Sequence, residues 1–201
     1  MSGIITATNL QTSNIKSATG NAGATIASNG DMTMSASRKL YAPGHIVQVQ
    51  SDILTTYWAS GTSTTAWVDT PLEVTITPSS TSSKIMITGM INFSGEAGSH
   101  VDFKVVRGGS DILLTTSTLG NRQASHIHYY CGSNDDVYQI IPGRIELLDS
   151  PSSTSALTYT LRAATPHSAG YAALLNQVAT DADQAYNAYT VSTLTCWEVA
   201  G

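Results

Sequence analysis

The sequence predicts an all-β protein: an antiparallel, jelly-roll-like β-sandwich head that follows an extended N-terminal attachment segment. Only 11% of the 201 residues are charged, less than half of the roughly 25% found in average soluble domains. Serine and threonine, with 25 and 27 residues, make up about a quarter of the chain, and threonine suits the pleated surface of a sheet. From residue 43 onward, apolar and polar residues alternate in short runs that end at Gly, Ser, Pro or Asn, which is typical of antiparallel strands and turns.

The composition also excludes several classes of protein. A hydrophobic content of 41% and a net charge of −5 are unlike those of a disordered chain, and the residues typical of helical bundles do not recur at helical spacing. The nine Lys and Arg residues are scattered, so we expect no nucleic-acid partner. No run approaches the ~18 apolar residues of a membrane span, and the first residues lack the pattern of a signal peptide. We therefore expect synthesis in the cytoplasm and no membrane insertion.

Residues 1–42 form a segment of Ala, Gly, Ser, Thr and Asn in which apolar residues are too sparse to bury a core within one copy. Turn signals at Gly20-Asn21, Gly23 and Asn29-Gly30-Asp31 divide it into short extended pieces. Such a segment either stays a disordered tail or becomes ordered by winding against identical segments or by docking on a larger assembly; the low charge favours ordering. The residues expected to attach it are the isolated aliphatic ones, Ile4, Ile5, Leu10, Ile15 and Ile26.

The head, residues 43–201, is expected to bury its core between two sheets. Ile85, Ile87, Ile91 and Phe93 share one face of a strand, with Gly89 in the same series marking a bulge. The same alternation predicts strands over 45–50, 72–77, 84–93, 100–107, 111–116, 126–130, 137–141, 144–148, 156–163, 171–176 and 187–200. Residues 179–188 have enough helical propensity for one turn.

One sequence pattern occurs twice in the head. Residues 72–82 read LEVTITPSSTS, and residues 145–155 read IELLDSPSSTS. Each copy predicts a strand, a Pro-Ser-Ser-Thr-Ser turn and a second strand. Two interpretations stay open at this point: the same hairpin chemistry arose twice, or two equivalent hairpins occupy matching places in the two halves of a sandwich.

The cysteines and histidines offer little metal chemistry. Cys131 and Cys196 match no CxxC or zinc spacing and are expected to be reduced thiols in or near strands. His126 and His128 alternate on one strand, so both rings are expected on one side. A third ligand from His100, Asp102 or His167 would complete a metal site there. The favoured alternative is a polar strand face, so we expect no bound metal.

The acidic residues point to turns rather than to a site. Asn134-Asp135-Asp136 offers three oxygen-bearing side chains but lacks an EF-hand pattern, and a solvated turn is favoured. Asp181 and Asp183 have the same interpretation. No nucleophile elbow, phosphate loop or HExxH motif is present, and no pair of carboxylates is marked out as catalytic. We therefore expect no enzymatic activity and no cofactor.

The aromatic residues are more informative. Tyr57 and Trp58 precede a Gly-Thr-Ser turn, Trp67 follows it, and Tyr171 lies in a later loop. Aromatic rings among polar neighbours stack on sugars or anchor protein interfaces. Burial in the core or at a subunit interface is favoured over contact with a glycan. As candidates for surface or receptor contact we select Tyr57, Trp58, Trp67 and Tyr171.

Five runs follow one another between residues 43 and 201: PGHIVQVQSDILTT, TPLEVTITPSSTSSKIMITGMINF, VVRGGSDILL, LDSPSSTSALTYTLRA and STLTCWEVAG. Together they resemble a family of tailed-phage (cyanophage-type) virion structural and tail-fibre-like proteins. The run NLQTSNIKSATGNAGATIASNGDM is similar to the short polar N-terminal segments by which such proteins join the particle. The resemblance implies a homotrimeric β-sandwich head on a virion-attached stem, and no catalysis.

The expected function is therefore that of a bacteriophage virion protein, a homotrimeric tail fibre or spike. Residues 1–42 would dock on other virion proteins, and the head would contact the host surface, with a bacterial surface glycan as partner. One alternative is a capsid decoration protein that clamps neighbouring capsid subunits. A further alternative, from a different class, is a free carbohydrate-binding module.

Overall fold

The computed structural model describes residues 14–16, 22–29, 31–34, 42–61, 66–117, 120–132, 137–166 and 170–201. The chain divides into two compact units, Met1–His45 and Ile46–Gly201, and the boundary expected between residues 42 and 43 lies close to this division. The described part of the chain is built from antiparallel strands. It contains no helix long and apolar enough to cross a membrane.

The N-terminal unit contains an antiparallel sheet of β1 (Asn14–Lys16), β2 (Ala22–Ile26) and β3 (Met32–Met34). The predicted turn at Asn29 is confirmed. The Asn29 side chain accepts a hydrogen bond from the Asp31 N–H at 3.1 Å and donates one to the Asp31 carboxylate at 2.7 Å. Gly23, expected in a turn, lies within β2 instead.

The expected attachment residues are only partly described. Ile15 lies in β1 and Ile26 in β2. Ile4, Ile5 and Leu10 lie outside the described residues. Their role in attachment stays a prediction.

The described part of the head contains eight long strands, and each of them overlaps a predicted run. These are β4 (Ile46–Leu54), β6 (Val68–Ile76), β7 (Lys84–Gly95), β8 (Ser99–Arg107), β10 (Ile127–Cys131), β11 (Ile141–Asp149), β12 (Leu157–Ala164) and β14 (Ser192–Val199). Shorter strands are β5 (Trp58–Ala59), β9 (Ser110–Asp111) and β13 (Ala173–Leu175). The all-β prediction is confirmed.

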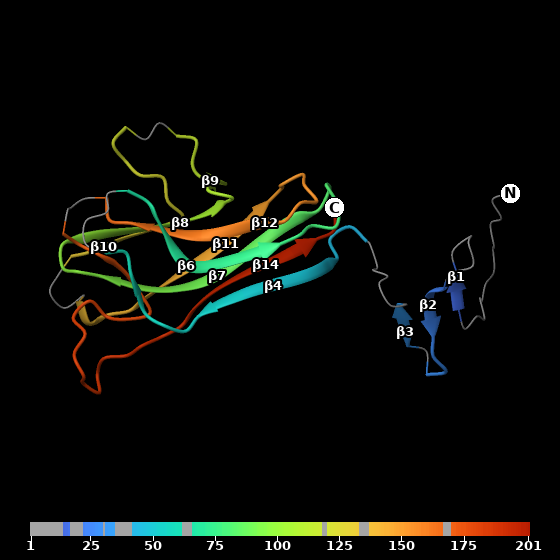
Figure 1. The fold of residues 1–201 in the computed structure, drawn as a ribbon, viewed down its shortest axis with the longest axis horizontal. Helices are drawn as coiled ribbons and strands as arrows, with labels where there is room; N and C mark the ends of the chain where they lie inside the picture. The colour runs from blue at the N-terminus through green and yellow to red at the C-terminus, as the bar shows by residue number, and fades with distance from the viewer. Residues whose placement is uncertain are drawn as a thin grey trace. The chain divides into compact units, whose positions relative to one another are not determined.

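The long strands form two facing antiparallel sheets (Figure 1). The β14 sheet has the order β4-β14-β7-β11, with β13 and β5 continuing beside the end of β7. The β12 sheet has the order β6-β12-β8-β10, and β9 pairs with β8. Strands therefore pair from the outside of the chain inward: β4 with β14, β6 with β12, β7 with β11, and β8 with β10. This is one long hairpin rolled into a sandwich, which is the strand order of a jelly roll.

The core lies between the sheets, as the alternation predicts. Ile85, Ile87, Ile91 and Phe93 are buried on one face of β7. Phe93 meets Phe103 of the opposite sheet with ring centres 5.0 Å apart. Full burial of a side chain of this size contributes about 1.5–3 kcal/mol relative to exposure, so the two inward faces supply the main force that holds the sandwich together.

Gly89 does not mark a bulge, because β7 keeps its register with both neighbouring strands at this position. A Cβ atom on Gly89 would lie 2.7 Å from the Thr193 carbonyl oxygen of β14. Glycine is needed at position 89 because β14 approaches closely there, and not because the strand bulges as expected.

Three local predictions are wrong. Of the strand predicted over 111–116, only Asp111 is in a strand, because β9 ends there. Ile112 is buried, and Leu113 has a φ of 52°, which a strand does not adopt. Residues 137–140 precede β11 without strand structure. Residues 179–188 form turns rather than a helical turn, with the Asn187 N–H bonded to the Gln184 carbonyl at 3.0 Å.

The two copies of the repeated pattern are not hairpins. Each Pro-Ser-Ser-Thr-Ser connection carries the chain from one sheet to the other, from β6 to β7 and from β11 to β12. Because Ile76 pairs with Leu157 and Ile85 pairs with Asp149, both connections lie at one end of the sandwich, near the C-terminus (Figure 1). The copies therefore occupy equivalent corners of the rolled hairpin.

A buried carboxylate fixes the first of these corners. Glu198 on β14 is fully buried and accepts hydrogen bonds from the Ser79 N–H at 2.7 Å, the Ser79 hydroxyl at 2.5 Å and the Ser83 hydroxyl at 2.7 Å. The Gln48 amide of β4 donates a fourth at 2.6 Å. Burial alone would raise the pKa of Glu198, but these hydrogen bonds outweigh it and hold the pKa below its ordinary value of 4.5.

We predict that Glu198→Gln lowers the free energy of unfolding by about 1–3 kcal/mol at pH 7, because the amide replaces an acceptor by a donor among buried hydroxyls. Urea denaturation measures this, and Glu73→Gln, at an exposed position, is the control, with an expected change within about 0.5 kcal/mol. Since the pKa of Glu198 is lower in the folded state, its stabilisation is present above the unfolded pKa and is lost as the pH falls through the folded pKa. The difference between Glu198→Gln and the wild type should therefore disappear in acid; equal stabilities at pH 7 would contradict the assignment.

Candidate functional site

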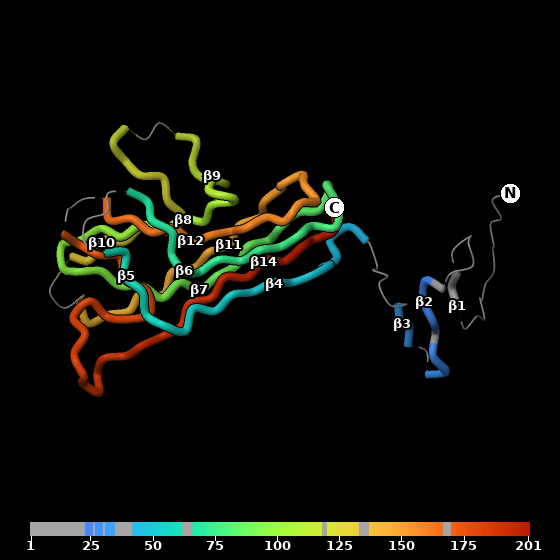
Figure 2. The backbone as a smooth tube through the Cα atoms, viewed as in Figure 1, coloured from blue at the N-terminus to red at the C-terminus, as the bar shows by residue number. Residues whose placement is uncertain are grey.

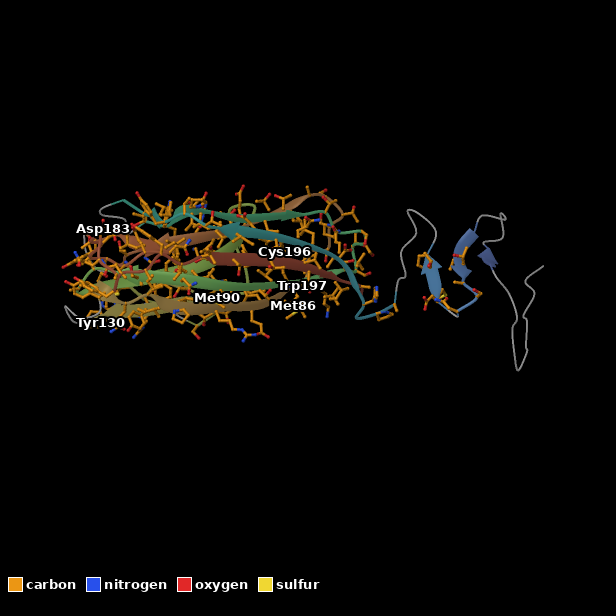
Figure 3. The ribbon with its side chains drawn as sticks, turned by 90° about the horizontal axis from the view of Figure 1, so that it is seen from below. Met86, Met90, Tyr130, Asp183, Cys196 and Trp197 are labelled. Atoms are coloured by element: carbon orange, nitrogen blue, oxygen red, sulfur yellow. The ribbon has the colours of Figure 1, made fainter. Side chains whose placement is uncertain are left out.

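The outer face of the β14 sheet carries a row of apolar side chains that crosses all four long strands. Trp197 pairs in register with Val49 of β4 and with Met86 of β7, and Met86 pairs with Leu148 of β11. Val49 is 42% exposed and Leu148 50%. Figure 3 shows Met86, Met90 and Trp197 along the strands of this sheet. The row makes this face a candidate surface for contact with another protein.

A second apolar pair flanks the row on the same face. Ile53 and Met90 are each 56% exposed and lie on either side of Thr193. The charged residues beside Met90, Arg144 and Glu146 on β11, form an ion pair with each other at 3.0 Å. Their charges are therefore balanced within one copy, and a partner need not supply the opposite charge.

The opposite end of the head from the C-terminus carries a tyrosine cluster. Tyr57, Tyr138, Tyr186 and Tyr189 are between 49% and 70% exposed. The Tyr57 and Tyr189 rings stack at 5.8 Å, and Tyr138 meets Tyr186 edge-on at 6.4 Å. They come from three segments: the one after β4, the one before β11, and residues 177–191, which project beyond the strands (Figure 2). Exposed rings held in this way can stack on sugar rings.

A polar hollow lies directly beside Tyr189. It is lined by Asp181, Asp183, Gln184 and Asn187. The Tyr189 hydroxyl donates to the Asp181 carboxylate at 2.5 Å, and this bond, with the nearby negative charge, raises the pKa of Tyr189 above its ordinary value. Asp181 therefore holds a ring of the cluster in place rather than serving as an isolated turn residue.

Buried Asn176 anchors this end of the head. Its backbone φ is +64°, which asparagine tolerates better than most residues. Its amide nitrogen donates to the carbonyls of Leu54 at 2.8 Å and Thr56 at 2.9 Å, and its amide oxygen accepts from the Ser192 hydroxyl at 2.7 Å. One side chain thus joins the segment that carries Tyr57 to the end of the segment that carries Tyr189.

The other selected aromatic residues do not join this cluster. Trp58 packs against the hydrophobic core, and Tyr171 is half-buried, with its carbonyl accepting from the Thr165 hydroxyl at 3.2 Å. Trp67 covers Lys104, whose ammonium lies 4.3 Å from the ring centre, and donates to the Gln123 side chain at 3.1 Å. Trp58 and Trp67 are partly buried and make contacts within the head. This agrees with the favoured interpretation of the aromatic residues, and their selection for receptor contact stays a prediction.

The histidines selected as a metal pair have different partners. His126 Nδ1 accepts from the Val105 N–H at 3.0 Å, and burial lowers the pKa of this ring. His128 Nδ1 lies 2.6 Å from the buried Asp102 carboxylate. Within the described ranges, no group of three His, Cys, Asp or Glu side chains is placed to hold a metal ion. The third-ligand candidate His167 and the loop Asn134–Asp136 lie outside those ranges.

Both cysteines lie in strands, as predicted. Cys131 ends β10 and Cys196 is in β14; both are buried and neither forms a disulfide. Burial, aided by the Asp149 carboxylate, raises the pKa of Cys196 to about 12. Its thiol is therefore unreactive at neutral pH.

Sequence reasoning missed most of the two surfaces. In the cluster it selected Tyr57 alone, and it selected none of the residues of the apolar row. A signal for the row was present, because Met86 and Met90 stand at the outward positions of a strand whose inward positions are already apolar. Nothing in the sequence indicated that Tyr138 meets Tyr186 or that Tyr57 meets Tyr189.

No protein-family model matches the chain, and no match is found among curated proteins. The resemblance to phage virion proteins therefore stays a prediction. The apolar row and the tyrosine cluster are therefore the observations that bear on function.

We predict that Asn176→Ala lowers the free energy of unfolding by about 2–4 kcal/mol, because three hydrogen bonds of the side chain are lost, two of them buried. Asn176→Gly keeps the positive φ and is the matched control for the backbone. If the side chain is the anchor, the glycine variant is also strongly destabilised in urea. If the glycine variant is as stable as the wild type, only the backbone conformation matters and the anchor assignment is wrong.

Proposed function

We propose that the protein is a structural component of a bacteriophage virion, a homotrimeric tail-fibre or spike-type protein. Residues 1–42 attach it to the particle, and the jelly-roll head is exposed for contact with the host surface. The observation that carries the proposal is the apolar row across the outer face of the β14 sheet. Jelly rolls occur in viral capsid proteins and in lectins, but a fold alone does not define a function.

The apolar row favours assembly for a physical reason. Val49 and Leu148 in the row, and Met90 beside it, are exposed and cost free energy in water, at about 25 cal/mol per Å² of apolar surface. Packing between copies removes that surface from water. Aromatic residues and methionine are enriched at the centres of protein interfaces, and lysine is depleted there. A chain with only 11% charged residues fits the same interpretation.

The tyrosine cluster supports a role in contact with the host. The chain enters the head at Ile46, the start of β4, and Tyr57 follows the end of that strand. Nine residues of strand span about 30 Å. If the preceding segment is attached to the particle, the cluster lies at the far end of β4 from the point of entry. Three copies would present three clusters and bind a repetitive glycan with added avidity.

A capsid decoration protein is the second candidate, because the same apolar face would fit on a capsid subunit as well as on another copy. Labelling the protein on intact particles separates the two. Signal at the tail supports a fibre or spike, and signal over the whole head supports decoration. A free carbohydrate-binding module is the third candidate, favoured by the exposed tyrosines and the polar hollow, and it would be found as a monomer that binds glycans tightly.

We predict that the wild-type protein has three times the mass of the 21.1 kDa chain by light scattering. Met90→Lys places a charge in the proposed interface and should raise the concentration at which the trimer dissociates by at least about tenfold. Because the dissociation constant of a trimer varies as the square of the concentration, this corresponds to ~2.8 kcal/mol per trimer. The matched control is Thr75→Lys, at an exposed position of the β12 sheet, with no expected effect. A folded wild-type monomer would contradict the trimer, and a trimer unaffected by Met90→Lys would contradict this interface.

We predict that Tyr57→Ala and Tyr186→Ala each weaken binding to bacterial surface polysaccharide, by about 1–3 kcal/mol if each ring stacks on a sugar as rings stack on bases. A glycan array with the full chain identifies the ligand, and titration of each variant measures the loss. Tyr130→Ala, at another exposed tyrosine, is the control. Equal binding by all three variants and the wild type would exclude the cluster as the contact surface.

A further inference from the structure

The segments that build the tyrosine cluster carry negative charge and no Lys or Arg. The rings come from the residues that follow β4, from those that precede β11, and from 177–191. The chain has no Lys or Arg between residues 40 and 83, between 123 and 143, or after 162, whereas Asp181 and Asp183 lie in the last of these stretches. A ligand that reaches the cluster therefore meets carboxylates among aromatic rings.

Both carboxylates lie beside the Tyr189 ring. Asp181 accepts a hydrogen bond from the Tyr189 hydroxyl at 2.5 Å, and Asp183 lines the same polar hollow, which has a volume of about 410 Å³. The bond to Asp181 is the main cause that raises the pKa of Tyr189, and the charge of Asp183 is a further cause. Figure 3 shows Asp183 at the end of the head. The ring thus lies within the field of two negative charges.

The segments of the cluster are joined, so that rings and carboxylates form one surface. The Tyr57 ring stacks on Tyr189 at 5.8 Å. The Thr180 N–H, next to Asp181, donates to the Val137 carbonyl at 3.0 Å, which ties the hollow to the segment that carries Tyr138. A ligand of the size of a few sugar rings can therefore contact a ring and a carboxylate at the same time.

The Asp183 carboxylate is open to a ligand. It is exposed, and within the described residues no hydrogen bond or ion pair to it is found. Asp69 and Asp111, by contrast, are each paired with a basic side chain of the head. Asp181 accepts from Tyr189 through one oxygen, and a carboxylate has acceptor positions for further donors.

We propose that the tyrosine cluster binds a saccharide that bears a free amino group. The ammonium group donates to the carboxylates of Asp183 and Asp181, and a positive charge is also attracted to the face of a tyrosine ring. The apolar face of the sugar stacks on an exposed ring, and the exposed Gln184 amide offers a donor and an acceptor to its hydroxyls. An acidic saccharide is repelled by the same carboxylates. The inference rests on the proposed role of the cluster in contact with the host surface, and it adds the charge of the ligand.

The test is calorimetric titration of the full chain with the tetramer of glucosamine, at a mildly acidic pH at which its amines are protonated. The fully N-acetylated tetramer keeps the sugar rings and removes the charge, and tetralysine supplies ammonium groups without sugar. We expect the glucosamine tetramer to bind at least about fivefold more tightly than either, because one exposed ion pair contributes up to about that factor. Its affinity should fall as the salt concentration rises.

Each probe contradicts a different part of the proposal. Equal affinity for the N-acetylated tetramer, or an affinity that salt does not change, would overturn the choice of an amine. Equal affinity for tetralysine would overturn the choice of a saccharide. No measurable binding of the glucosamine tetramer would overturn both.

Variants locate the binding. Asp183→Asn and Asp181→Asn remove one charge each and keep an oxygen that accepts hydrogen bonds, so the bond from Tyr189 to position 181 is retained. Each should weaken binding of the glucosamine tetramer at least about threefold and leave binding of the N-acetylated tetramer unchanged, which a merely structural role would not do. Glu73→Gln, which removes the same charge from an exposed position of the β12 sheet, should change neither affinity.

Unchanged affinity of Asp183→Asn for the glucosamine tetramer would overturn the proposal. Such a failure is distinct from failure of the proposed function. The mass measured by light scattering and the position of the protein on the particle do not depend on the charge of the ligand, and Tyr57→Ala tests the cluster with whichever glycan binds.

Discussion

The alignment of the strands around the first corner of the head depends on one buried interaction, the set of hydrogen bonds that the Glu198 carboxylate accepts where β6 crosses to β7. The donors come from β4, from the corner itself and from the first residue after it, so the bonds join stretches that lie more than a hundred residues apart in the chain. β14 is paired on one side with β4 and on the other with β7. Holding Glu198 at the corner therefore helps to set the register of β14 with both of its neighbours.

The two outer faces of the sandwich have opposite chemistry, and this difference divides the possible roles of the head. The β14 sheet exposes Trp197, Met86 and Met90, side chains that gain by being covered. On the β12 sheet, Glu73, Thr75 and the ion pair of Arg162 with Asp69 face solvent, and part of the remaining surface carries a polar pocket. One face is thus suited to packing against protein and the other to contact with water or a polar ligand.

Two of the buried carboxylates, Glu198 and Asp102, show how burial alone fails to indicate function. Glu198 and Asp102 are both inaccessible to solvent. The neighbours of Glu198 overcompensate the cost of burying its charge, which is what a structural group requires. The neighbours of Asp102 do not, and its principal partner, His128, is exposed to a pocket. The number of hydrogen bonds, rather than depth, distinguishes the carboxylate whose burial is fully compensated from the one whose burial is not.

The long strands and the core could be predicted from the sequence, because inward and outward positions alternate along each strand and Ile85 to Phe93 show that alternation locally. The sequence also placed a turn at Asn29. Which sheet each strand joins was decided only in the tertiary structure: the repeated Pro-Ser-Ser-Thr-Ser segments looked like hairpins, yet β6 and β7 lie in different sheets. The meeting of Tyr57 with Tyr189 was decided there too, since it depends on Asn176 joining segments over a hundred residues apart. Alternation is a property of neighbours in the chain, whereas sheet membership and surface clusters are set by which distant strands pair.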